Sequence, residues 1–98
     1  MESKNGKVAL ITGANKGIGK EISRQLGLLG YTVILTARDQ EAGAAAAAEL
    51  VAAGCDAHTF ALEVTNADDI SKLATYLEKQ YGKLDVLVNN AGIAIEWD

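Results

Sequence analysis

Short apolar runs alternate along this chain with segments whose apolar residues recur every three or four positions. The runs are rich in valine, isoleucine and leucine, as is typical of strands buried in a parallel sheet. They predict four strands, at residues 8–12, 32–37, 57–62 and 84–89. The segments between them predict three helices, at about residues 16–29, 40–53 and 66–81. This alternation predicts an α/β fold with a doubly wound parallel sheet in the strand order 3-2-1-4.

The predicted helices show where they end and which face they bury. In the first helix one face is expected to carry the apolar residues Ile18, Ile22, Leu26 and Leu29. In the third helix the expected apolar stripe is Ile70, Leu73, Ala74, Leu77 and Tyr81. Asn66 is the expected N-cap of that third helix. The alanine run at residues 44–48 favours helix and close packing on the sheet.

Composition restricts the class of protein. The 98 residues are 49% hydrophobic and 22% charged, which predicts a single globular domain over residues 1–98. A net charge of -4 argues against a nucleic-acid partner, which usually needs a basic face. The polar first residues do not resemble a signal peptide, and no apolar run approaches the ~20 residues of a membrane span. With a single cysteine, Cys55, the expected location is the cytoplasm, away from membranes.

The glycine-rich segment after the first strand carries the clearest chemistry. Gly13 allows a sharp turn, Gly17 leaves room for a diphosphate against the backbone, and Gly19 allows the helix to pack close to the sheet. The start of the helix directs unpaired N–H groups and a partial positive charge at the phosphates. Because the glycines follow a strand and open a helix, they predict a dinucleotide-binding loop rather than a plain turn.

The spacing of this loop, TGxxxGIG, resembles the short-chain dehydrogenase/reductase family, with its Rossmann-like fold. Two further segments match that family in register: residues 89–92 (NNAG), and residues 63–65 (EVT), where the family has D-V-T. The sequences NKGIG, LTARD and LDVLVNNAGIA are most similar to its carbonyl reductase branch. The resemblance extends from about Lys7 to Ala94, so it covers nearly the whole chain.

The end of the second predicted strand indicates which nicotinamide cofactor is bound. An acid at this position favours NAD, whereas here Ala37 is followed by Arg38, whose guanidinium can bind a 2′-phosphate with two hydrogen bonds. Lys16 in the loop offers a second positive charge, so we expect NADP(H). The alternatives are that Arg38 and Lys16 are solvated surface residues, or that Asp39 beside Arg38 gives dual specificity.

The resemblance also implies roles for residues beyond the loop. The family's acid after the third strand binds the adenine amino group, together with the next backbone N–H. Glu63 and Val64 stand at these positions, and Glu63 is longer than the family's aspartate by one methylene. Asn90 is assigned to the cofactor side, although Asn89 or Asn90 could instead join neighbouring strands. The predicted cofactor-binding residues are Gly13, Asn15, Lys16, Gly17, Ile18, Gly19, Arg38, Glu63, Val64, Asn90, Ala91 and Gly92.

The residues that would perform carbonyl reduction in the family are not found in this sequence. They are a serine and a Tyr-x-x-x-Lys pair, and the residues four places after Tyr31, Tyr76 and Tyr81 are Leu, Gln and Asp. We therefore expect no catalytic residue and no metal site here, with His58 and Cys55 as structural residues.

Three functions remain open at this point. The first is the cofactor-binding half of an NADPH-dependent oxidoreductase that acts on a small ketone or aldehyde. The second is a non-catalytic NADP(H)-binding module. The third is a structural or interaction half-domain that self-associates through the exposed edge of the fourth strand.

Overall fold

The computed structural model describes residues 6–14, 16–63 and 65–90. These residues form a four-stranded parallel sheet in the order β3-β2-β1-β4, which confirms the predicted topology. The strands are β1 (Val8–Thr12), β2 (Thr32–Ala37), β3 (Asp56–Ala61) and β4 (Val86–Val88). The two central strands are buried along their whole length, as their continuous apolar sequences predict.

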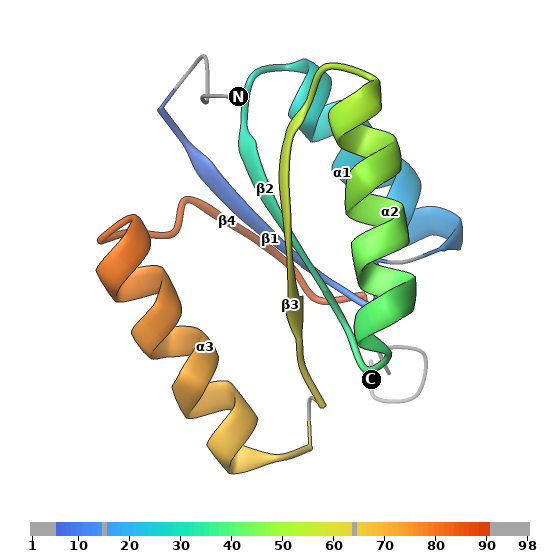
Figure 1. Ribbon diagram of the computed structural model, residues 1–98. Coiled ribbons are helices and arrows are strands. Elements are labelled where there is room, and N and C mark those ends of the chain that lie inside the picture. The colour runs from blue at the N-terminus through green and yellow to red at the C-terminus, as the bar shows by residue number, and fades with distance from the viewer. Residues whose placement is uncertain (1–5, 15, 64, 91–98) are drawn as a thin grey trace, which may run out of the picture.

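Helices cover both faces of the sheet. Their bounds are α1 (Gly17–Leu28), α2 (Gln40–Ala52) and α3 (Ala67–Gln80). Figure 1 shows α1 and α2 together on one face and α3 on the other. The core is divided accordingly: Ile11, Val33 and Leu50 belong to the cluster beneath α1 and α2, and Leu10, Ile34 and Leu73 to the cluster beneath α3.

Small residues, rather than large apolar ones, bring α1 onto the sheet. Its fully buried positions are Gly19, Ser23 and Gly27, one turn apart. Ile22 and Leu26 pack beside them as predicted, but the prediction was wrong for the outer two residues: the exposed fractions are 73% for Ile18 and 70% for Leu29. The row of small residues faces the sheet, so the row of larger apolar residues lies at the border of the contact, where Ile18 and Leu29 at its two ends are left in solvent.

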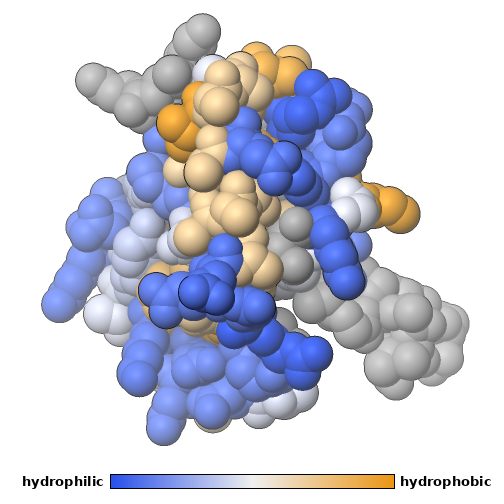
Figure 2. All heavy atoms as spheres, turned by 45° about the vertical axis from the view of Figure 1, so that its right-hand side comes forward, coloured by the Kyte–Doolittle hydropathy of each residue, from blue (hydrophilic) through white to orange (hydrophobic). Residues whose placement is uncertain are grey.

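The alanine run of α2 is partly core and partly surface. Ala46 and Ala47 are buried against the sheet, as expected, while the other alanines of the run are exposed. Figure 2 shows the exposed ones as an apolar band over this helix. Gly43 faces β3, where a Cβ would lie 2.5 Å from Thr59 Oγ1, so α2 also needs a glycine at its closest approach to the sheet.

Helix α3 begins as predicted but packs on a narrower face than predicted. Asn66 caps it, with its side-chain oxygen accepting from Asp69 N at 3.0 Å. Leu73 is buried and Leu77 is partly buried against the core, whereas the prediction was wrong for Ile70 and Ala74, which are exposed. Neither Ile70 nor Ala74 is buried against the four described strands.

Strand β4 is shorter than predicted. It pairs with β1 at only three positions, and Asp85 before it contacts Val8 with both its backbone and its side chain. Val86 and Val88 pack against the core beneath α1, while the exposed fraction of Leu87, on the opposite face, is 59%. Among the described residues no strand pairs with the outer edge of β4.

Candidate nucleotide-binding site

The predicted site residues that the structure describes lie at one edge of the sheet. Because all four strands are parallel, their carboxyl ends lie at this one end of the sheet, with Thr12 of β1 opposite Thr36 of β2. The glycine loop leaves β1 here, Arg38 follows β2, Glu63 follows β3, and Asn90 follows β4. Residues from four separate segments therefore meet at the carboxyl ends of the strands, where doubly wound sheets bind their ligands.

The glycines of the loop have the two conformational properties that the sequence predicts. Gly13 and Gly17 have φ values of 61° and 65°, in the left-handed region that favours glycine. A Cβ at Gly17 would meet nothing within 4 Å, so there is open space above the backbone. A Cβ at Gly19 would lie 2.8 Å from both Gly13 O and Asn90 Nδ2, which shows that α1 needs glycine to pack here.

The first turn of α1 is arranged to accept an anion. Lys16 is its N-cap residue and makes no side-chain capping hydrogen bond, and the first turn contains no acidic residue. In contrast, Asp39 caps α2 and Asn66 caps α3 through their side chains. Within the described part of the chain, the N–H groups that open α1 thus keep their partial positive charge uncompensated by a side chain.

Arg38 and Glu63 lie opposite each other at the ends of β2 and β3. Arg38 Nη1 is 3.5 Å from Glu63 Oε1, and the exposed fractions of the two side chains are 79% and 36%. Glu63 Oε2 accepts from Thr65 Oγ1 at 3.0 Å and from Thr65 N at 3.4 Å. The Thr65 hydroxyl, its backbone N–H and the Arg38 charge together hold the pKa of the Glu63 carboxyl below its usual value, against the opposing effect of desolvation.

A hydroxyl that the sequence analysis left without a role joins the loop to β4. Thr12 Oγ1 accepts from Asn90 N at 2.8 Å and lies 3.1 Å from Asn89 Oδ1. Asn90 Nδ2 in turn donates to Gly13 O at 3.1 Å. Both asparagines therefore join neighbouring strands, and a direct contact of Asn90 with a cofactor stays a prediction. In the sequence, this role of Thr12 could have been recognised from its position as the polar last residue of a buried strand, directly before the glycine turn.

Asn15, Val64, Ala91 and Gly92 lie outside the described residues. Cys55 is fully buried, and burial raises the pKa of its thiol, as expected of a structural cysteine. His58 Nε2 lies 2.7 Å from Asp56 Oδ1, so its ring is held by a neighbour on β3.

In the described parts of the chain, no cluster of three or more histidine, cysteine, aspartate or glutamate side chains could hold a metal ion. None of the helices described is both long and apolar enough to cross a membrane.

Comparison with known proteins agrees with this geometry. The family model of the short chain dehydrogenases matches residues 7–98. The carbonyl reductase [NADPH] 3 of Rattus norvegicus is 48% identical over 93 residues, which are 94% of this chain and 34% of that protein. The short-chain dehydrogenase/reductase 1 of Saponaria officinalis is 44% identical over 91 residues, 90% of this chain and 30% of the relative. The chain thus spans about a third of the length of the curated relatives it matches.

Solved structures show the same fold. A metagenomic short-chain oxidoreductase in complex with NADP superposes with a TM-score of 0.85 and 49% identity, over 90% of this chain and 40% of that structure. The F189W actinorhodin polyketide ketoreductase with NADPH superposes with a TM-score of 0.87 and 41% identity, over 94% of this chain and 35% of that one. The family match, which covers nearly the whole chain, and the glycine loop at the sheet edge lead to one conclusion. The chain belongs to the short-chain dehydrogenase family.

Proposed function

We propose that this chain forms the NADP(H)-binding part of an NADPH-dependent oxidoreductase that reduces a ketone or an aldehyde, or oxidises the alcohol in reverse. The observation that carries the proposal is the position of Arg38, directly after β2 and at the same sheet edge as the glycine loop. Its side chain is 79% exposed, so the guanidinium can turn toward a 2′-phosphate. Relatives named carbonyl reductase [NADPH] support the reaction class and a small carbonyl substrate.

The residues at the sheet edge fit such a dinucleotide. The diphosphate would lie over Gly17, where the backbone faces open space, and would accept from the N–H groups that open α1. Lys16 and Arg38 would hold the phosphate on the adenosine ribose. When bound, NADPH supplies the hydride. The part of this chain is to bind and orient the cofactor, because no tyrosine in its sequence is followed four places later by lysine.

A titration of the chain with NADPH and NADH tests this proposal. We expect NADPH to bind more tightly, and Arg38→Gln to cost it about tenfold in affinity, the magnitude of one charge-assisted interaction of ~1.4 kcal/mol. NADH affinity should change little. Arg24→Gln is the matched control, since Arg24 is an exposed arginine on α1 that pairs with Glu21 instead of facing the sheet edge. An unchanged NADPH:NADH ratio in Arg38→Gln would remove Arg38 from the site.

One observation supports a second function, that of a structural or interaction half-domain. The outer edge of β4 pairs with no strand among the described residues, and Leu87 on it is 59% exposed. Such an edge can pair with another chain. Sedimentation would detect self-association through this edge, and Leu87→Lys should reduce it. Tight NADPH binding by a monomer would instead argue against a purely structural role.

The cytoplasm is the location we propose for this protein. Cys55, the one cysteine of the sequence, is a buried free thiol, which suits a reducing compartment.

A further inference from the structure

We propose that Glu63 is a specificity-determining residue, which competes with the cofactor's 2′-phosphate for Arg38 and so restrains the preference for NADP(H) over NAD(H). The proposal rests on the proposed function, since it assumes that Arg38 faces the 2′-phosphate. It concerns a different residue and makes a prediction of the opposite sign: loss of the Glu63 charge should strengthen NADP(H) binding relative to NAD(H) binding.

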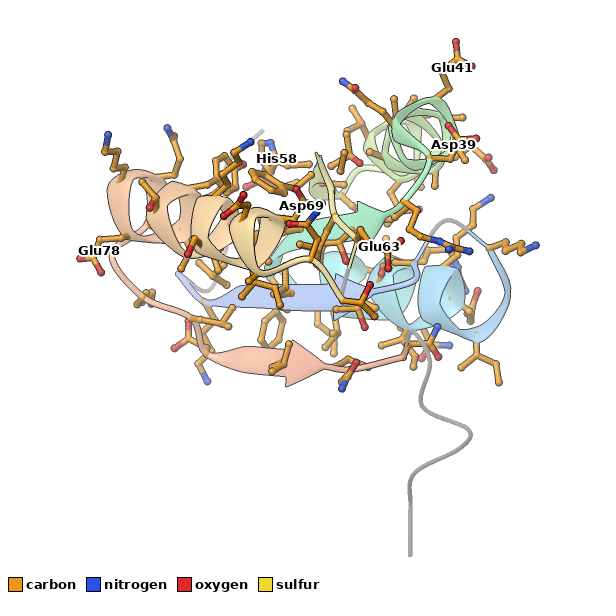
Figure 3. The ribbon with its side chains drawn as sticks, turned by 90° about the horizontal axis from the view of Figure 1, so that it is seen from below. Asp39, Glu41, His58, Glu63, Asp69 and Glu78 are labelled. Carbon is orange, nitrogen blue, oxygen red and sulfur yellow. The ribbon has the colours of Figure 1, made fainter. Side chains whose placement is uncertain are left out.

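One partner of the Arg38–Glu63 ion pair is fixed and the other is not. The Glu63 carboxylate is held by the hydroxyl and the backbone N–H of Thr65. Its own backbone N–H donates to Asp69 Oδ2 at 2.9 Å, at the start of α3. Figure 3 shows Glu63 beside this first turn, close to Asp69. Arg38, by contrast, is 79% exposed, and its contact with Glu63 is a single one at 3.5 Å.

Glu63 also opposes the 2′-phosphate through its charge. The Thr65 hydrogen bonds favour the ionised form of Glu63, so a fixed negative charge lies beside the guanidinium at neutral pH. A 2′-phosphate carries a charge of about −1.5 to −2 and binds arginine best through two parallel N–H groups. To form that fork, Arg38 must leave Glu63, and the phosphate must approach a carboxylate of like charge. NAD(H), with a hydroxyl at this position, meets neither cost.

The other carboxylate near Arg38 does not play this part. Asp39 follows Arg38 in sequence, but its Oδ1 accepts from the N–H groups of Glu41 and Ala42, so it is engaged in capping α2. In Figure 3 Asp39 lies at the start of α2, apart from Glu63. Glu63 is therefore the carboxylate that opposes the 2′-phosphate.

The test compares the affinities of NADP⁺ and NAD⁺ by calorimetric titration, at an ionic strength of about 20 mM, where surface charges are little screened. The variant is Glu63→Gln, because an amide keeps the length and the acceptor that Thr65 needs but loses the charge. We expect the NADP⁺:NAD⁺ affinity ratio to rise about two- to fivefold, the range of an exposed charge interaction. Glu78→Gln is the matched control, since it removes the same charge from the opposite end of α3, as Figure 3 shows.

Glu63→Asp is a second variant, in case Glu63→Gln does not fold, and Arg38→Gln distinguishes a failure of this inference from a failure of the proposed function. Glu63→Asp withdraws the charge by one methylene and should give a smaller rise in the ratio. Suppose that Arg38→Gln abolishes the NADP⁺ preference, as the proposed function requires. The inference would then be overturned if the NADP⁺:NAD⁺ affinity ratio of Glu63→Gln equals that of Glu78→Gln or falls below that of the wild type. If Arg38→Gln leaves the ratio unchanged, the proposed function fails as well. Thermal unfolding of each variant confirms that affinities are compared between folded proteins.

Discussion

Replacing Gly19 with alanine should weaken both the fold and the proposed site. The added Cβ would lie 2.8 Å from Gly13 O, 2.8 Å from Asn90 Nδ2 and 3.1 Å from Ala14 Cα. Two of these three atoms belong to the backbone of the glycine loop, so they cannot move without displacing the loop. Overpacking of this kind costs about 1–3 kcal/mol, and the better helix propensity of alanine returns at most ~1 kcal/mol. Because backbone atoms make two of the contacts, the cost should lie in the upper part of that range, about 2–3 kcal/mol, which leaves an expected net loss of stability of about 1–2 kcal/mol.

Thermal unfolding followed by circular dichroism measures this loss. For a domain of this size, each kcal/mol lowers the Tm by roughly 4–8 °C. Gly27→Ala is the matched control on the same helix, since its Cβ would lie 2.7 Å from the Cβ and Sγ of Cys55, away from the loop. Both variants should be destabilised, but only Gly19→Ala should also bind NADP⁺ less tightly. Wild-type stability in Gly19→Ala, or an equal loss of NADP⁺ affinity in Gly27→Ala, would refute the reasoning.

Three further predictions concern hydrogen bonds of side chains. Thr12→Val leaves the backbone N–H of Asn90 without its acceptor and should cost about 1–3 kcal/mol in urea unfolding, whereas Thr12→Ser should cost less. Asn66→Ala removes the cap of α3 and should cost about 1 kcal/mol in the same assay. The hydrogen bond from Val8 N lowers the pKa of Asp85 in the folded protein. The ionised Asp85 therefore stabilises the fold above about pH 4, and this stabilisation is lost as the pH falls further. The Tm of Asp85→Asn should therefore depend less on pH between about 5 and 3; an identical pH profile would contradict this.

The sheet could be predicted from the sequence because its strands and turns are specified by short, continuous stretches of the chain. Continuous apolar runs identify the buried strands, and glycines that require a positive φ or close packing identify the turns and the face of α1. The outward residues of the helices were harder to predict. Ile18 and Ile70 fit a helical apolar stripe, yet they are exposed, because periodicity shows which residues share a face but not how far the sheet beneath extends.

The site could be predicted in its parts but not in its connections. Gly13, Gly17 and Arg38 were identified from the spacing along one segment of chain. The pairs Thr12–Asn90 and Arg38–Glu63 join residues 78 and 25 positions apart, so they exist only after the strands have aligned. Sequence position placed Asn90 and Glu63 at the correct edge, but their partners depend on side-chain geometry that no periodicity encodes.

The two faces of the sheet differ in how completely the described residues cover them, and α1, whose start forms part of the proposed site, lies on the better covered face. Beneath α1 and α2, the core residues Ile11, Val33 and Leu50 are no more than 2% exposed, and glycines bring both helices close to the strands. On the α3 face, the strand residue Leu87 is 59% exposed, whereas its neighbours Val86 and Val88, on the other face, pack against the core. The buried residues beneath α1 fix the start of this helix. Its first N–H groups are therefore held in place without contacts from the α3 face. The described residues therefore support the proposed nucleotide binding without contacts from the α3 face.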